Sequence, residues 1–313
     1  MISCTEFIPC YSELFRYLEE KHGRDEVERF WEYLFKPTEE GIPLINFVKK
    51  EGIHGCWSYW TGTLNEEAAD FTMYLNEKRG FYLLEMHCCP SKGRLLELKE
   101  NIGIEPYHDY CLHCDGYRAA IEKIGLKYIY NFNGTDHAAC SILIYDPNIF
   151  DGRVIIDEDT MIMDRKASDN EYFHPDFHTG TNNGVEYLGT NFGTNEVTEF
   201  LTQYTKNVLH RTLEAIQQQG LSAIRENITE TYRKEKAEDV LTIEQNENSL
   251  TVKVAYCPAV KHLRATGRTI SAWYRCTTEV VMKTFAEAGG FCFTMESYDE
   301  ETGAAVYRFE NKQ

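Results

Sequence analysis

The chain has 313 residues, of which 42% are hydrophobic and 13% aromatic, enough apolar material for about two globular domains. Its formal net charge of −18 argues against binding to nucleic-acid phosphates or anionic membranes, because both need a basic face. No apolar run approaches the ~20 residues of a membrane span, and the first residues lack the pattern of a signal peptide. We therefore expect a cytoplasmic protein.

The sequence repeats itself at a nearly constant spacing. Residues 185–188 repeat residues 15–18 at an offset of 170, and the offset is 168 from Gly52 to Pro90. Near Gly125, which matches Gly289, the offset is 164. Small changes of this kind are expected from loop insertions in a duplicated domain. We predict a first repeat over 1–146, an acidic linker over 147–171 and a second repeat over 172–313.

Within the first repeat, apolar spacing predicts helices followed by hairpins. The expected helices cover 11–20, 25–35 and 43–51, a further helix opens at Pro90, and a long helix covers 107–124. The expected hairpins pair 71–76 with 81–86 and 127–132 with 138–145.

The second repeat gives the same order. Its expected strands are 240–244, 250–255, 291–296 and 304–309, with a helix over 272–288. In the linker, 154–156 and 161–163 are expected to form a short hairpin. The predicted fold class is α+β, with two pseudo-symmetric repeats that each pack a helical layer on a four-stranded, mostly antiparallel sheet.

Cysteines are concentrated in the first repeat, which holds eight of the eleven in the chain. Only Cys89 has a matching cysteine in the second repeat, Cys257, while the other positions of interest are opposite Arg275, Thr278 and Val306. This asymmetry favours a site in the first repeat. A helix packed on the sheet would bring together Cys89, Cys111, Cys114 and Cys140.

Thiolates and imidazoles are ligands for zinc or iron, so one hypothesis is a metal bound by these four cysteines. A second is a cysteine nucleophile, with Cys89 or Cys111 activated by a lowered thiol pKa and His137 as general base. His108 shares a helix face with Cys111 and is expected to contact a ligand. The alternative is that these cysteines are small buried hydrophobes.

The motifs Cys89-Pro90, Tyr110-Cys111, Gly125-Leu126 and Cys140 resemble the L-2-amino-thiazoline-4-carboxylic acid hydrolase family. The resemblance implies ring opening of a small heterocycle, with cysteines in or near the site. The order of helices and hairpins also resembles the ligand-binding fold of 4-vinyl reductase domains and certain vesicle-trafficking subunits.

Two further groups of residues are candidates for binding. His174, Asp176 and His178 match a common zinc or iron ligand set, although the same segment is typical of a helix start. Trp57 and Trp60 can line an apolar pocket, although aromatic residues at this density are more typical of a core.

We predict a hydrolase that opens a C–N bond in a small nitrogen- or sulfur-containing heterocycle, with or without the assistance of a metal. The alternatives are a sensor or carrier that binds a small molecule or metal without turnover, and a structural scaffold. No Gly-rich phosphate loop is present, so no nucleotide cofactor is expected. The expected partner is a small molecule, and the sequence leaves the oligomeric state open.

Overall fold

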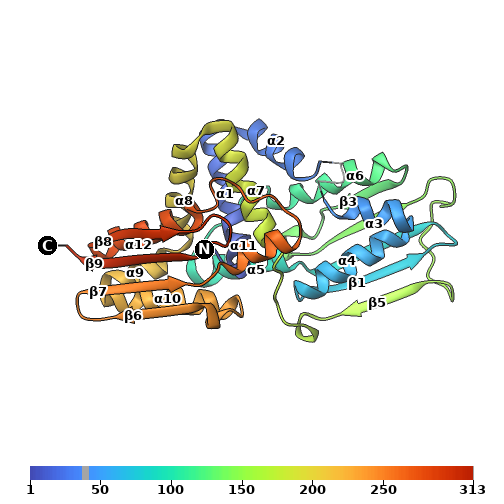
Figure 1. Cartoon of the computed structure of the whole chain (residues 1–313). Coiled ribbons are helices and arrows are strands. Elements are labelled where there is room, and N and C mark those ends of the chain that lie inside the picture. Colours follow the sequence, from blue (N-terminus) through green and yellow to red (C-terminus); the bar gives the residue numbers. More distant parts are fainter. Residues whose placement is uncertain (37–41, 313) are drawn as a thin grey trace. The chain divides into compact units, whose positions relative to one another are not determined.

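A computed structural model describes residues 1–36 and 42–312. The fold is α+β, with two antiparallel sheets and helices on them (Figure 1). The chain forms two compact units. The first-sheet unit is Leu18–His174, and the second-sheet unit is Met1–Tyr17 together with the chain from Pro175 onward. None of the described helices is long and apolar enough to cross a membrane.

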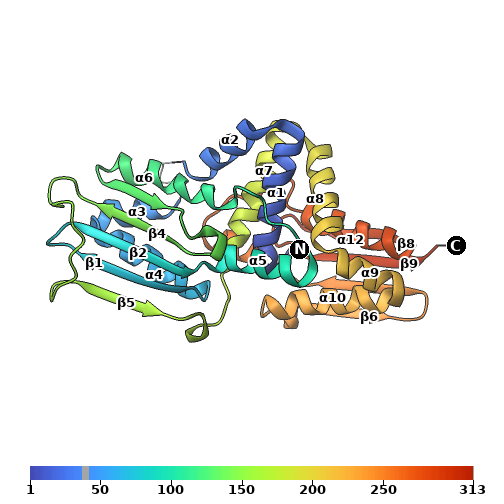
Figure 2. The same ribbon diagram turned by 180° about the vertical axis from the view of Figure 1, so that it is seen from behind.

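The first-sheet unit has a five-stranded sheet in the order β3-β4-β2-β1-β5. Its strands are β1 (Asp70–Asn76), β2 (Phe81–Cys88), β3 (Lys127–Asn131), β4 (Cys140–Tyr145) and β5 (Met161–Arg165). Its helices are α2 (Arg24–Leu34), α3 (Leu44–Glu51), α4 (His54–Glu66), α5 (Pro90–Ile102) and α6 (Tyr117–Lys123). Short 3-10 helices are η2 (Tyr110–Gly116), η3 (Thr135–His137) and η4 (Ala167–Asp169). Figure 2 shows α3, α4 and α6 on one face of this sheet.

Three expectations for this unit need correction. The sheet has a fifth strand because the linker supplies β5, which pairs antiparallel with β1, whereas 154–156 form no strand. The long helix expected over 107–124 is divided into η2 and α6. Helix α4 was not predicted from the sequence, although its buried residues Cys56, Trp60 and Leu64 are spaced four apart, as on one face of a helix.

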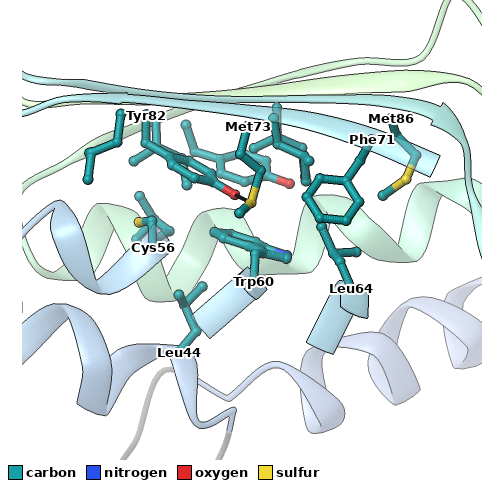
Figure 3. Close-up of a cluster of buried hydrophobic side chains, with 14 of the residues drawn as sticks. Leu44, Cys56, Trp60, Leu64, Phe71, Met73, Tyr82 and Met86 are labelled. Atoms are coloured by element: carbon teal, nitrogen blue, oxygen red, sulfur yellow. Dashed lines mark hydrogen bonds between the residues drawn. The ribbon is translucent and has the colours of Figure 1, made fainter. Parts of the chain in front are cut away.

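The core of the first-sheet unit lies between its helices and the inner face of the sheet, as Figure 3 shows. Trp60 on α4 is 4% exposed and stacks on Tyr82 of β2, with ring centroids 5.4 Å apart. Leu64, one turn further along α4, and Phe71 of β1 extend the same layer. Trp60 therefore belongs to the core, and Trp57 packs against it.

The second-sheet unit has a four-stranded sheet in the order β6-β7-β9-β8. Its strands are β6 (Leu241–Gln245), β7 (Ser249–Val254), β8 (Phe291–Tyr298) and β9 (Ala305–Asn311). Its helices are α7 (Phe177–Phe192), α8 (Thr194–Val208), α9 (His210–Gln219), α10 (Leu221–Lys234), α11 (Pro258–Ala265) and α12 (Cys276–Gly289). The 3-10 helices are η1 (Cys4–Glu6) and η5 (Glu238–Val240), and α1 (Phe7–His22) belongs to this unit up to Tyr17. Figures 1 and 2 show α9, α10 and α12 on one face of this sheet.

Both sheets have the same strand order once β5 is set aside. The strand register corrects one match between equivalent residues of the two repeats that was made from the sequence. Cys140 is opposite Met86 in the first sheet, and Ala305 is opposite Val254 in the second. Since Val254 is the repeat equivalent of Met86, the counterpart of Cys140 is Ala305 rather than Val306.

Candidate functional site

Four cysteines from three elements of the first-sheet unit surround one tyrosine. Cys89 is the residue before α5, Cys111 and Cys114 lie on η2, and Cys140 begins β4. All four are half-buried. Burial is the main cause that raises the pKa of the Tyr130 hydroxyl on β3. The four thiols lie close enough to this hydroxyl to raise its pKa further. We call these four residues the thiol cluster.

Local structure explains how these side chains meet. Cys111 and Cys114 are three residues apart, and residues at that spacing eclipse in a 3-10 helix, so both point to the same side. Tyr128 donates a 2.9 Å hydrogen bond to the carbonyl of Cys114, which holds η2 against β3. The backbone amide of Cys89 donates to the carbonyl of Ala138 at 2.6 Å, which brings the start of α5 to the loop before β4.

The thiols of the cluster are poor nucleophiles in this environment. Burial raises the pKa of Cys111 to about 11, against a lowering by Lys92, and burial also raises the pKa values of Cys89, Cys114 and Cys140. This is the opposite of the lowered thiol pKa expected from the sequence. Desolvation disfavours the thiolate, and the nearby thiols oppose its charge further.

Two ionisable residues that sequence reasoning missed border the thiol cluster. Lys92 is 9% exposed, and its ammonium has no hydrogen-bond or ion-pair partner among the described residues. Glu67 follows the last turn of α4 and is also 9% exposed. Burial raises the pKa of its carboxyl to about 7, although His174 lowers it, and Glu67 in turn raises the pKa of Cys89.

The other side chains expected at this site lie elsewhere or are open to solvent. His137 ends η3 and is exposed, and His108 is exposed beside Glu19 and Asp109. Neither histidine forms a hydrogen bond or ion pair with a cysteine of the cluster among the residues that the structure describes.

The histidine segment does not form the ligand set expected from the sequence. His174 Nδ1 is 2.7 Å from Glu66, whereas His178 Nε2 is 2.9 Å from Glu235. Asp176 accepts a hydrogen bond from Thr179 at 2.9 Å. The two histidines therefore bind different carboxylates, and they belong to different compact units.

One buried group of the described residues has three possible ligand atoms within 4.8 Å of one another, and it could hold a metal ion. It consists of Cys4, His178 and Glu235, all in the second-sheet unit. Among the described residues, no three sulfurs of the thiol cluster all lie within 4.8 Å of one another. Of the buried trio, the sequence alone pointed only to His178.

The repeat alignment contains a signal that would have found the missed carboxylates. Glu67 and Glu235 match at the offset of 168, and each directly follows the last residue of its helix. Lys92 is matched by Val260 at the same offset. A charged residue opposite an apolar one in an internal repeat marks a position where the two copies differ in chemistry.

Comparison with known proteins adds no assignment, since no family model, curated protein or solved structure matches this chain. The geometry of the two sites is therefore the basis for the proposals below.

Proposed function

We propose that the first half of the chain binds an iron–sulfur cluster through Cys89, Cys111, Cys114 and Cys140, and that the protein acts as a sensor or carrier. The observation that carries this proposal is the meeting of four thiols beside the buried, unpaired ammonium of Lys92. Thiolate ligands make such a cofactor a net anion, so a buried cation beside it offsets an otherwise costly charge.

The spacing of the sulfurs favours a cluster over a single zinc ion. Zinc–sulfur bonds of about 2.3 Å in a tetrahedron place the sulfurs roughly 3.8 Å apart. In the part of the chain that the structure describes, the sulfurs of the thiol cluster are further apart, because no three of them all lie within 4.8 Å of one another. In a [4Fe–4S] cluster each of the four cysteines binds a different iron atom, so their sulfurs lie further apart.

Binding of the cofactor should depend on pH, because burial raises the pKa values of the thiols. The thiols lose their protons to solvent when they bind iron, so affinity should rise with pH. In the metal-free protein the same thiols stay protonated and avoid four unpaired charges in a half-buried site.

The test is anaerobic reconstitution of the full chain with ferrous iron, ferric iron and sulfide, followed by iron and sulfide analysis and visible absorption. We expect a stoichiometric cluster in the native chain and in Cys292→Ser, a matched control with an exposed cysteine in the second sheet. Cys111→Ser and Cys140→Ser should abolish it. Lys92→Met should keep the cluster but make its reduction potential more negative. Stoichiometric zinc with no sulfide, or no metal at all, would refute the proposal.

Hydrolysis of a small heterocycle is the second candidate, favoured by the buried Glu67 carboxyl beside Cys89. A carboxyl with a pKa of about 7 suits a general acid or base at neutral pH. Its test is ring opening of a cyclic thiazoline carboxylate, followed by the appearance of the new primary amine that cleavage of the ring C–N bond by water releases. Activity that Glu67→Gln abolishes would favour the enzyme, and recovery of the intact ring with the native chain would exclude it.

A further inference from the structure

The second-sheet unit contains a buried polar group that the proposed iron–sulfur site does not use. Cys4 on η1, His178 in the first turn of α7 and Glu235 at the end of α10 are 0%, 1% and 5% exposed. One ligand atom from each lies within 4.8 Å of the others. Three segments distant in sequence thus bring a thiol, an imidazole and a carboxylate to one point.

The carboxylate is held in place by groups around it. Glu235 Oε1 accepts hydrogen bonds from the Ser3 hydroxyl at 2.7 Å and from the Cys4 amide at 2.6 Å. Its other oxygen is 2.9 Å from His178 Nε2. Contacts of this kind orient a ligand before a metal arrives.

Two buried polar atoms at this point have no hydrogen-bond partner among the described residues. One is Nδ1 of His178, which is on a ring only 1% exposed, and the other is the hydroxyl of Tyr274. Tyr274 is 2% exposed and close enough to Glu235 and Cys4 for both to affect its ionisation. Orphaned buried polar atoms are costly, and a bound ion is one of the recognised ways in which such a site is satisfied.

We propose that Cys4, His178 and Glu235 bind one zinc ion that ties the segment before α1 to α7 and α10. Sulfur, nitrogen and oxygen donors suit zinc, and structural zinc sites are four-coordinate. A thiolate, a carboxylate and a neutral imidazole supply two negative charges, which balance the dication in a buried site. The ion replaces the thiol proton and any proton shared by His178 and Glu235, and these protons pass to solvent.

The site is independent of the iron–sulfur proposal, and the test separates the two. Zinc alone is titrated into the metal-free, reduced full chain and into Cys111→Ser/Cys140→Ser, in competition with a chromophoric chelator. We expect one tight zinc in both proteins, with a melting temperature that rises with zinc concentration.

Matched variants locate the ion. Cys4→Ser is nearly isosteric and should weaken zinc binding by about 100-fold or more, as should Glu235→Gln. Cys10→Ser, which alters a second buried cysteine of the same unit, should bind like the native chain. With cobalt in place of zinc, thiolate charge-transfer absorption should appear in native and Cys10→Ser proteins and be absent from Cys4→Ser.

Circular dichroism shows that each variant is folded before its affinity is compared. Native affinity in folded Cys4→Ser, no tight zinc in the folded native chain, or loss of the zinc only in Cys111→Ser/Cys140→Ser would each overturn this proposal.

Discussion

The helix before the first strand of each sheet ends at a buried glutamate, and the two glutamates behave in opposite ways. Backbone conformations match closely, with φ and ψ of −81° and 1° at Glu67 and −83° and 0° at Glu235. Burial raises the pKa of Glu67 to about 7. Burial opposes ionisation of Glu235 as well, but His178, Ser3 and the Cys4 amide lower its pKa to about 2. The same kind of helix end thus holds a carboxyl group that ionises near neutral pH in one unit and a carboxylate that stays ionised in acid in the other. The difference arises because Glu235 has hydrogen-bond partners that stabilise its charge.

The largest expected effect concerns the core packing of α4, the helix that ends just before Glu67. Trp60 is the aromatic centre of the first-sheet core, and its repeat position in α10 is Ile228. Trp60→Ala should lower the free energy of unfolding by about 3–5 kcal/mol, because it leaves a large cavity. Amide hydrogen exchange in β1 and β2 should accelerate. Unchanged exchange there would contradict the assignment of Trp60 to the core.

Removing the carboxylate of Glu235 should destabilise the metal-free protein. Its folded pKa lies below the unfolded value of 4.5, so its contribution is present above pH 4.5 and is lost as pH falls towards 2. Glu235→Gln should cost about 3 kcal/mol at pH 7, with a smaller cost below pH 4. Urea unfolding at several pH values measures this, and an equal cost at all pH values would show that the Glu235 carboxylate is not stabilised in the folded protein.

The same substitution at Glu67 should have the opposite sign. Its folded pKa of about 7 lies above the unfolded value of 4.5, so the folded state loses stability as pH rises between these values. Glu67→Gln should add up to about 3 kcal/mol above pH 7 and leave stability unchanged below pH 4.5. Parallel stability profiles of native and variant proteins from pH 5 to 8 would contradict the buried neutral carboxyl.

The smallest effect concerns the residue after each glutamate. Ala68 and Lys236 have φ of 49° and 54°, in the left-handed region that disfavours side chains. Ala68→Gly and Lys236→Gly should each stabilise the protein by about 0.5–1 kcal/mol in thermal unfolding. A loss of stability in both variants would show that the shared helix end is not strained.

The sequence by itself determined the α+β class and the four hairpins β1–β2, β3–β4, β6–β7 and β8–β9. These depend on local periodicity and on turn residues such as Gly125, which a sequence carries directly. It also led to the hypothesis that a helix packed on the sheet would bring together Cys89, Cys111, Cys114 and Cys140, which is an inference about tertiary packing.

Only the tertiary structure decided which charged groups meet. Cys4, His178 and Glu235 lie in three segments whose contact depends on packing of the whole unit. The local pattern of the linker predicted a strand at 161–163, but its pairing with the edge of β1 rather than with 154–156 depends on tertiary structure. The thiol pKa values also follow from tertiary structure, because burial is a property of the surroundings and not of the cysteine.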